Sequence, residues 1–451
     1  MATALILLAA GKGTRMQSDL PKVLHEIGNA PLLHHAMQSA ASLSPEKRVV
    51  VAGHGADTVE AAAHAYDPEV EVVLQAEQLG TAHAVDQARA ALAGFEGDAL
   101  VLYGDTPFIR PETLEAMLAA RADYAVVVLG FEAADPARYG RLVTQGDTLE
   151  RIVEYKDASD EERAITLCNS GVIAADCGVL FELLSEVGNE NAAGEYYLTD
   201  IPELAQKRGL TAGVVRCSEA ETLGINSRAE LAAAQGIFQH RMRQQAIENG
   251  VSLQAPDTVQ FSADTVLGRD SVIEPNVVFA PGVTVETGAR IRAFSHLEGC
   301  HVARGAVVGP YARLRPGTEL SEDVKIGNFV ELKNATLAEG AKVNHLSYIG
   351  DATIGAASNV GAGTITCNYD GVLKHKTQIG ARAFIGSNTM LVAPVTVGDD
   401  AMTASGSVIT RDVPATDLAV ARARQENKSG FAVKLFEKLK AIKAKRQKDV
   451  S

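Results

Sequence analysis

The chain has 451 residues, of which 46% are apolar, so it has a globular composition and the length for two or three domains. Its formal net charge of -14 argues against a general nucleic-acid binder, and no apolar run approaches the length that spans a bilayer. Five scattered cysteines without a C-x-x-C pair favour a reduced, cytoplasmic protein.

The first part of the chain alternates apolar runs with helical patterns. Residues 4–10 are apolar and lead into Gly11-Lys12-Gly13-Thr14-Arg15-Met16, which predicts a buried strand, a glycine loop and a helix. This start lacks the basic flank and cleavage pattern of a signal peptide. The loop also lacks the third glycine of the dinucleotide fingerprint and the G-K-[ST] ending of a P-loop.

Further strands are expected at residues 48–52, 70–74, 99–103 and 124–129, with helices at 32–41 and 81–92. Such alternation predicts βαβ units in a mostly parallel, doubly wound α/β sheet. Ligands of such sheets bind beyond the carboxyl ends of the strands, where Gly11 and Asp105 fall.

A polar helical pattern follows at residues 227–249, and Asn249-Gly250 provides a C-cap. We therefore expect a first domain at 1–226, a linker helix at 227–250 and a second domain at 251–451. The second domain ends in a tail whose residues 431–445 predict a basic helix.

From residue 267 to 409 an aliphatic residue returns at every sixth position, with a few short steps and one insertion, and glycine often follows it. A period of six is neither that of a helix nor that of an alternating strand. It predicts short stacked strands joined by tight corners, each placing one side chain in a narrow axial core. The alternative is a β-sandwich, which a fixed step over so many repeats disfavours. The pattern predicts a parallel β-helix.

Single residues of the first half carry little information alone. Asp105 can cap a helix, Lys22 can be a solvated lysine, and Glu154 with Lys156 can be an exposed pair on a strand. The glycine loop can mark a simple strand-to-helix turn.

Together these motifs carry a resemblance. LAAGKGTRM, LPKVLH, LQAEQLGTAHA, YGDTP, YGR, IVEYKDA, CNSG, GEYYLTD and GINSR occur in an order that resembles the sugar-phosphate nucleotidyltransferases. Up to about Arg424 the chain is similar to the bacterial family of bifunctional N-acetylglucosamine-1-phosphate uridyltransferases/glucosamine-1-phosphate N-acetyltransferases.

The resemblance implies a Rossmann-like nucleotidyltransferase domain, a linker helix and a left-handed β-helix of hexapeptide repeats, assembled as a homotrimer. It implies acetyl transfer from acetyl-CoA to glucosamine-1-phosphate, then uridylyl transfer from UTP to N-acetylglucosamine-1-phosphate with release of pyrophosphate. Only small-molecule substrates are expected, with no nucleic acid and no membrane. The product would be a precursor of peptidoglycan and lipopolysaccharide.

Uridylyl transfer needs alignment and charge neutralisation more than a base, because the attacking sugar-phosphate oxygen is already ionised. The resemblance assigns Arg15 and Lys22 to catalysis. It assigns Asp105 and Asn226 to Mg²⁺, which prefers oxygen ligands and keeps several waters. The substrate-binding set that it implies is Leu8, Ala9, Ala10, Gly11, Lys22, Gln75, Gly80, Thr81, Tyr103, Gly104, Asp105, Gly140, Glu154, Asn169 and Asn226. Of these residues, the resemblance implies that Gln75, Gly80 and Thr81 bind the uracil. It implies that Gly140, Glu154 and Asn169 bind the N-acetylglucosamine moiety.

Acetyl transfer needs a base that takes a proton from the amine, and neutral imidazole suits that role near pH 7. Taken alone, a histidine such as His345 is more often a hydrogen-bonded structural residue, and Arg315 and Lys333 alone would be solvated charges on a coil face. The resemblance makes His345 the base and places the sugar phosphate at Arg315 and Lys333. It assigns Tyr348 and Asn359 to the sugar, Asn368 and Tyr369 to the loop near the acetyl group, and Ala362, Ser387, Ser405 and Arg422 to CoA.

Two residues depart from the family pattern: Ser405 stands where relatives often have alanine, and Asn344 where a small residue is usual. Two other functions stay open at this point. One is a single-activity nucleotidyltransferase whose β-helix serves oligomerisation. The other is a non-catalytic scaffold resembling the exchange-factor subunits of translation. Asp105 with Asn226, and His345 with the Asn368-Tyr369 loop, favour two activities.

Overall fold

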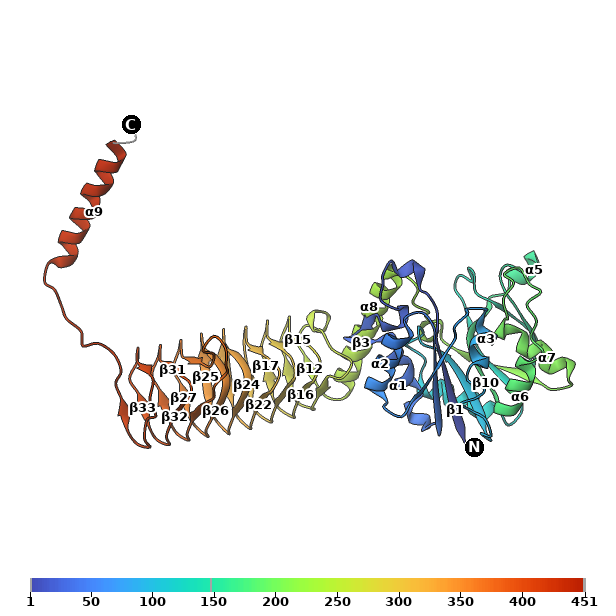
Figure 1. The fold of residues 1–451 in the computed structure, drawn as a ribbon, viewed down its shortest axis with the longest axis horizontal. Coiled ribbons are helices and arrows are strands. Elements are labelled where there is room, and N and C mark those ends of the chain that lie inside the picture. The colour runs from blue at the N-terminus through green and yellow to red at the C-terminus, as the bar shows by residue number, and fades with distance from the viewer. Residues whose placement is uncertain (1, 147, 449–451) are drawn as a thin grey trace. The chain divides into compact units, whose positions relative to one another are not determined.

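The computed structural model describes residues 2–146 and 148–448, and contacts divide the chain into two compact units (Figure 1). The first unit runs to Gln245 and includes Phe261–Ala263; the second comprises Ala246–Gln260 and the chain from Asp264 onward. Residues 449–451 of the predicted second domain lie outside the described residues. Within the described residues, no helix is long and apolar enough to cross a membrane.

The first unit is built on a nine-stranded sheet of order β5-β4-β1-β6-β10-β7-β11-β9-β8. Its strands are β1 (Thr3–Ala9), β4 (Lys47–Ala52), β5 (Glu71–Leu74), β6 (Asp98–Tyr103), β7 (Val126–Glu132), β8 (Arg141–Gln145), β9 (Thr148–Val153), β10 (Leu167–Asp176) and β11 (Ala212–Cys217). A two-stranded ribbon joins β2 (Glu26–Ile27) to β3 (Ala30–Pro31).

The prediction of a mostly parallel sheet is wrong in part. β1 is parallel to β4 and β6, β4 to β5, and β7 to β11. β10 runs antiparallel between β6 and β7, and β9 runs antiparallel to β8 and β11. The step from Gln145 to Thr148 is too short for a crossover, so β8 and β9 must reverse direction.

Helices cover both faces of this sheet, as expected for a doubly wound fold. Alternate residues of β1 point to opposite sides: Ile6 packs with α3 and α6, and Leu7 with α1 and α4. The helices of the unit, one of which crosses its boundary, are α1 (Leu32–Ser39), α2 (Ala56–Tyr66), α3 (Thr81–Asp86), α4 (Pro111–Ala120), α5 (Asp160–Arg163), α6 (Cys177–Leu184), α7 (Ile201–Lys207) and α8 (Arg228–Glu248).

Two helix predictions need correction. The helix expected after the glycine loop is only the 3-10 turn η1 (Thr14–Met16), flanked by left-handed Gly13 and Gln17. The helix expected at 81–92 ends at Asp86, because the amides of Gln87, Ala88 and Arg89 bond to carbonyls three residues back. Further short 3-10 turns are η2 (Lys22–Leu24), η3 (Ala41–Leu43), η4 (Leu198–Asp200) and η5 (Glu219–Glu221).

The predicted helix at 227–249 is confirmed as α8. Its Ala234 and Phe238 pack with Ile27, Phe108 and Ile225 in a separate apolar cluster of the first unit. The basic helix predicted in the tail is present as α9 (Phe431–Lys448).

The second unit consists of stacked parallel strands, in which each strand pairs with the strand one turn of the chain later (Figure 1). Ile273 pairs with Ile291, and Ile291 with Val308, so three hexads make one coil. The first set of strands is β12 (Ser252–Leu253), β14 (Val272–Ile273), β17 (Arg290–Ile291), β20 (Val307–Val308), β23 (Lys325–Asn328), β25 (Lys342–His345), β27 (Asn359–Val360), β30 (Phe384–Ile385), β33 (Met402–Thr403) and β35 (Leu418–Ala419).

The other strands form a second, branched set. They are β13 (Val266–Leu267), β15 (Val278–Phe279), β16 (Val283–Val285), β18 (His296–Leu297), β19 (Cys300–Val302), β21 (Arg313–Leu314), β22 (Thr318–Leu320), β24 (Glu331–Leu337), β26 (Tyr348–Ile354), β28 (Ile365–Cys367), β29 (Thr377–Ile379), β31 (Met390–Val392), β32 (Val395–Val397) and β34 (Val408–Ile409). One 3-10 turn, η6 (Pro256–Thr258), precedes the coils.

The hexad pattern correctly identified the core of this unit. Apart from half-buried Leu267, every aliphatic or equivalent hexad residue from Ile273 to Ile409 is at most 3% exposed. Glycine is needed where coils close on one another: a Cβ at Gly327 would overlap the Asn344 carbonyl.

Candidate functional site

The carboxyl ends of β1 and β6 open into a cavity of about 320 Å³. Leu8 pairs with Tyr103, and the Gly104 amide donates to the Leu8 carbonyl at 2.9 Å, which holds the two strand ends together. Predicted site residues that line the cavity are Leu8, Ala9, Ala10, Gly11, Lys22, Gln75, Gly80, Thr81, Tyr103 and Asp105. Beyond them, Gln78 and Glu195 also line it, and sequence reasoning had not identified these two.

The two predicted metal ligands converge on one point. The Lys22 ammonium donates to the Asp105 carboxylate and, at 3.0 Å, to Asn226 Oδ1, and the Ile225 amide donates to the Asp105 carbonyl at 3.0 Å. Two oxygen donors that already face one cation suit a hard divalent ion. Among residues 2–146 and 148–448 there is no group of three or more His, Cys, Asp or Glu that could hold a metal. A metal held by Asp105 and Asn226 would therefore draw most ligands from nucleotide and water.

The predicted uracil residues form a second group beside the same cavity. The Gln75 side chain is 3% exposed, and its amide donates to the Gly80 carbonyl at 3.1 Å and lies 3.0 Å from His83 Nδ1. Thr81 begins α3 and accepts the Leu198 amide at 3.0 Å. Gly80 has φ +121°, and a Cβ there would overlap the Tyr196 carbonyl, so only glycine fits.

The three residues predicted for the N-acetylglucosamine moiety also lie together, although they come from different strands and loops. The backbone amide of Asn169 donates to the Gly140 carbonyl at 2.8 Å. A Cβ built at Gly140 would lie 3.5 Å from both the Asn169 Cβ and a Glu154 carboxylate oxygen. Burial raises the pKa of Glu154, although a hydrogen bond from Thr199 opposes the shift. The carboxylate of half-buried Glu154 thus lies next to the position that a side chain on Gly140 would fill.

Arg15 differs from Lys22, the other predicted catalytic residue of this unit. It lies on η1, is exposed, and is not among the residues that line the cavity. Gly104, Gly140, Glu154, Asn169 and Asn226 likewise lie outside that lining set.

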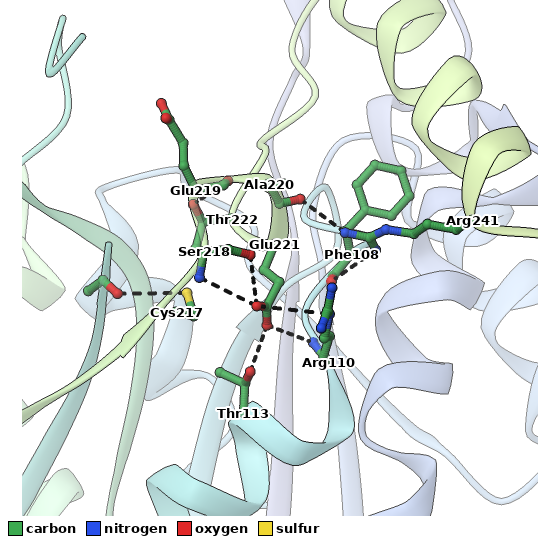
Figure 2. A network of polar contacts seen from close by, with 11 residues as sticks. Phe108, Arg110, Thr113, Cys217, Ser218, Glu219, Ala220, Glu221, Thr222 and Arg241 are labelled. Atoms are coloured by element: carbon green, nitrogen blue, oxygen red, sulfur yellow. Dashed lines mark hydrogen bonds and ion pairs between the residues drawn. The ribbon is translucent and has the colours of Figure 1, made fainter. Parts of the chain in front are cut away.

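A buried carboxylate supports the segment that leads to Asn226 (Figure 2). Glu221 is 5% exposed and accepts the Thr113 hydroxyl at 2.6 Å, the Ser218 hydroxyl at 2.9 Å and the Arg110 amide at 3.4 Å. It therefore ties the chain after β11 to the N-terminus of α4, where a carboxylate is favourable. These hydrogen bonds lower the pKa of Glu221, although desolvation by burial, the largest single influence, raises it.

Arg241 of α8 holds the same two segments from the other side, as Figure 2 shows. Its guanidinium lies 4.7 Å from the Phe108 ring centre and donates to the carbonyls of Phe108 and Ala220, both at 3.4 Å. Glu221 and Arg241 thus join the segments that follow Asp105 and precede Asn226, in addition to the hydrogen bond from Ile225 to the Asp105 carbonyl.

In the second unit, four predicted residues occupy equivalent positions on successive coils. Val343 pairs with Val360, Val360 with Ile385, and Ile385 with Thr403. Two positions after each of these paired residues come the residues that we call the His345 row: His345, Ala362, Ser387 and Ser405. In the next coil, Thr403 pairs with Ala419. The equivalent position is therefore Ala421, and Arg422 follows it directly. His345, Ser387, Ser405 and Arg422 are exposed.

His345 has a partner that sequence reasoning missed. Asn328 lies one coil earlier in the same register, and its Oδ1 is 3.1 Å from His345 Nδ1. If this nitrogen carries the proton, Nε2 keeps its lone pair. The hexad register could have identified Asn328, because it precedes His345 by one coil.

The predicted phosphate-binding residues form a second line. Leu314 pairs with Leu332, so Arg315 stands next to Lys333, and Lys333 pairs with Gly350. Glu331 accepts a hydrogen bond from Arg315 at 2.9 Å. Interaction with Lys374 of the insertion, the largest cause, together with the charge of Arg315, lowers the pKa of Lys333. Lys374 was not identified because the insertion leaves the hexad register.

The remaining predicted residues divide between these two regions. Tyr348 begins β26 close to Gly350 and Asn368, since a Cβ on Gly350 would overlap the Tyr348 hydroxyl. Asn368 is buried, whereas Tyr369 is exposed at the start of the insertion. Asn359 lies on β27 beside Lys342, in the other set of strands, so this chain does not bring it into the Lys333 cluster.

Comparison with known proteins gives consistent matches. Residues 5–168 match the model of the MobA-like NTP transferase domain, and residues 297–409 match that of the GMPPB C-terminal domain. "Bifunctional protein GlmU" of Ruegeria pomeroyi is 69% identical over 449 residues and covers 100% of both chains. The proteins of that name from Jannaschia sp. and Cereibacter sphaeroides are 65% and 68% identical over 446 residues, covering 99% of this chain and 98% of theirs.

Proposed function

The chain belongs to the GlmU family of bifunctional proteins, and on that premise we propose that each of its two structural units houses one of the two activities. The chain is a bifunctional enzyme of UDP-N-acetylglucosamine synthesis, with acetyltransferase and uridyltransferase activities. This product supplies cell-wall synthesis, and we propose that it serves peptidoglycan and lipopolysaccharide.

One observation supports the division most directly. Lys22, Asp105 and Asn226 meet within the first unit, while His345 and its row lie within the second. We assign uridylyl transfer to the domain at 1–226 and acetyl transfer to the domain at 251–451, with 227–250 as linker. Because each unit holds its own group of candidate residues, we favour two activities over the single-activity and scaffold alternatives.

In the uridyltransferase, the residues bind, align and offset charge. The amides of Ala10 and Gly11 and the cations Arg15 and Lys22 would hold the phosphates, with Arg15 moving to them from its exposed turn. Gln75, Gly80 and Thr81 would bind the uracil, and Gly140, Glu154 and Asn169 the sugar. Asp105 and Asn226 would hold Mg²⁺, which supplies Lewis-acid stabilisation of phosphate charge.

In the acetyltransferase, His345 would accept the proton of the glucosamine amine at Nε2, while Nδ1 donates to Asn328. Arg315 and Lys333 would bind the sugar phosphate, and Tyr348 and Asn359 the sugar. Asn368 and Tyr369 would lie near the acetyl group. The remainder of the row, Ala362, Ser387 and Ser405, would lie along acetyl-CoA, with Arg422 at its far end.

Asn359 lies in the other set of strands from the Lys333 cluster, which supports a site completed by another subunit. We propose that the coils wind left-handed and pack as a homotrimer in the cytoplasm. Acetyl transfer would then require the trimer, and uridylyl transfer, confined to one unit, would not.

The test begins with the purified protein, acetyl-CoA, glucosamine-1-phosphate, UTP and Mg²⁺, with one component omitted at a time. Omitting UTP should leave N-acetylglucosamine-1-phosphate as the end product, whereas omitting acetyl-CoA should stop both products. Mixed and reassembled Lys333→Ala and Asn359→Ala proteins should partly recover acetyl transfer, because one site would take these residues from different chains. Mixed His345→Ala and Arg422→Ala proteins should not recover it, because one chain supplies both of these residues to a site. A monomer by light scattering with full acetyltransferase activity would contradict the trimer.

A further inference from the structure

A carboxylate holds two asparagines together at one corner of the coil. Asn334, Asp351 and Asn368 occupy one position on three successive coils, and we call them the corner ladder. The Asn334 amide donates to one Asp351 oxygen at 2.7 Å, and the Asn368 amide donates to the other at 2.5 Å. Asp351 and Asn368 are each 7% exposed. The buried carboxylate is therefore satisfied from both sides.

The corner ladder adjoins the residues that we assign to the sugar and the acetyl group. Gly350 precedes Asp351 and lacks a side chain, and a Cβ there would lie 2.7 Å from Asn368 Nδ2 and overlap the Tyr348 hydroxyl. The Gly350 amide donates to the Thr366 hydroxyl at 2.7 Å, which fixes β28 immediately before the insertion. Asp351 thus lies where Tyr348, Asn368 and the first residues of the insertion meet.

Asp351 also lies close to the cations of the predicted phosphate site. Burial raises its pKa, but the hydrogen bonds from Asn334 and Asn368 and the charges of Lys374 and Lys333 offset this, so its pKa lies below the usual value. The carboxylate counters the mutual repulsion of Lys333 and Lys374.

We propose that Asp351 is a positioning residue of the acetyltransferase, which holds Asn368 and the base of the insertion against Tyr348 and Lys333. The proposal rests on the proposed function of the second unit. Asp351 acts through its neighbours and need not touch substrate.

The backbone alone does not explain an aspartate at this corner. Asp351 has φ 48° and Asn334 has φ 46°, and asparagine, aspartate and glycine all tolerate this left-handed conformation. The partners do explain it. A carboxylate only accepts, so its two oxygens receive both asparagine amides, whereas an asparagine would present its own amide to one of them.

The first experiment is Asp351→Asn in the full-length protein. We expect kcat of acetyl transfer to fall by about tenfold or more, while KM for glucosamine-1-phosphate changes by less than about threefold, because alignment rather than phosphate attraction is lost. Uridylyl transfer should not change. The control Asp323→Asn, at an exposed corner with φ 57°, should leave both activities unchanged.

The reciprocal variant, Asp351→Asn with Asn334→Asp, separates positioning from simple folding. The side-chain amide introduced at position 351 can donate to the carboxylate introduced at position 334, while the amide oxygen at 351 accepts from Asn368. Both hydrogen bonds and the charge of the corner ladder therefore remain. Acetyl transfer should recover to within about threefold of the unaltered protein. If Asp351→Asn fails to fold, the activity of the reciprocal variant still tests whether Asp351 positions the site.

Two results would overturn the proposal: an unchanged kcat in folded Asp351→Asn, or a folded reciprocal variant that stays inactive. Acetyl transfer by the unaltered protein, measured in the same assay, tests the proposed function separately. Its absence would reject that function, whereas a loss confined to the variants concerns Asp351.

Discussion

Lys22 donates hydrogen bonds to the carboxylate of Asp105 and to the side-chain oxygen of Asn226, 3.0 Å away, so its ammonium lies between the two proposed metal ligands. These residues come from three distant parts of the chain. An ammonium and a divalent cation cannot share this position, since two cations a few ångströms apart repel strongly. Lys22 therefore has to leave this pair when a metal binds there.

The first prediction concerns this competition. Lys22→Met should tighten binding of Mn²⁺, used as a spectroscopic probe, by about tenfold in the absence of nucleotide, because a competing cation is removed. Uridylyl transfer should nevertheless fall by about 100-fold, because a phosphate-binding charge is lost. Electron paramagnetic resonance measures the metal affinity. Lys12→Met, an exposed lysine of the preceding glycine loop, is the matched control. An unchanged Mn²⁺ affinity would show that Lys22 does not compete.

The second prediction is that the two activities are separable. Asp105→Ala should abolish uridylyl transfer and spare acetyl transfer, while His345→Ala should do the reverse, because the residues belong to different units. A chelator should act like Asp105→Ala. Each product is measured by its own assay. Loss of both activities from one substitution in a folded protein would count against two independent sites.

The third prediction concerns Asn328. Asn328→Ala removes the partner of His345 Nδ1, so kcat of acetyl transfer should fall by about tenfold with KM for acetyl-CoA little changed. Uridylyl transfer serves as the internal control. A uniform rise in KM at constant kcat would indicate a binding role instead.

How much of this was predictable from sequence differs between the units. The hexads predicted the core of the second unit because each buried residue marks one short strand of a repeating coil. The pairing of core residues on successive coils also aligns the exposed residues two positions later, so His345 and Ser387 fall in one row.

In the first unit, apolar runs revealed the parallel strands β1, β4, β5, β6 and β7 but not β8, β9, β10 or the parallel strand β11. Lys374 and Asp351 were also missed. Their roles come from neighbours on other coils and on an insertion, and no local pattern records them.

The fourth prediction concerns pH and Glu154. Burial raises its pKa above the ordinary 4.5, with Thr199 opposing and Asp157, Asp200 and Glu195 adding to the shift. The unfolded chain then releases this proton at lower pH than the folded protein does, so the residue lowers stability as pH rises above about 4.5. Glu154→Gln should raise the unfolding temperature of the first unit at pH 7.5 and have no effect at pH 4. An equal effect at both pH values would exclude ionisation as the cause.

The fifth prediction concerns the Glu221 network. Glu221→Ala leaves the Arg110 amide and the Thr113 and Ser218 hydroxyls without their buried acceptor, so the first unit should lose about 1–3 kcal/mol of stability. The neighbouring exposed Glu219→Ala should change stability by less than about 0.5 kcal/mol. Urea unfolding measures both. Equal effects would show that burial of Glu221 contributes nothing.

The coil absorbs changes of length at its corners but not within its strands. Ile273 pairs with Ile291, 18 residues later, and Ile291 pairs with Val308, 17 residues later, yet all three stay in the core. The insertion lengthens the next part of the coil without disturbing the register, because the bridge between Tyr369 and Lys374 closes it and Ile379 re-enters opposite Ile354. A residue lost within a strand has no such outlet and would turn the side chains after it to the opposite face. The second unit therefore has the equivalent of a reading frame, which is reset at each corner.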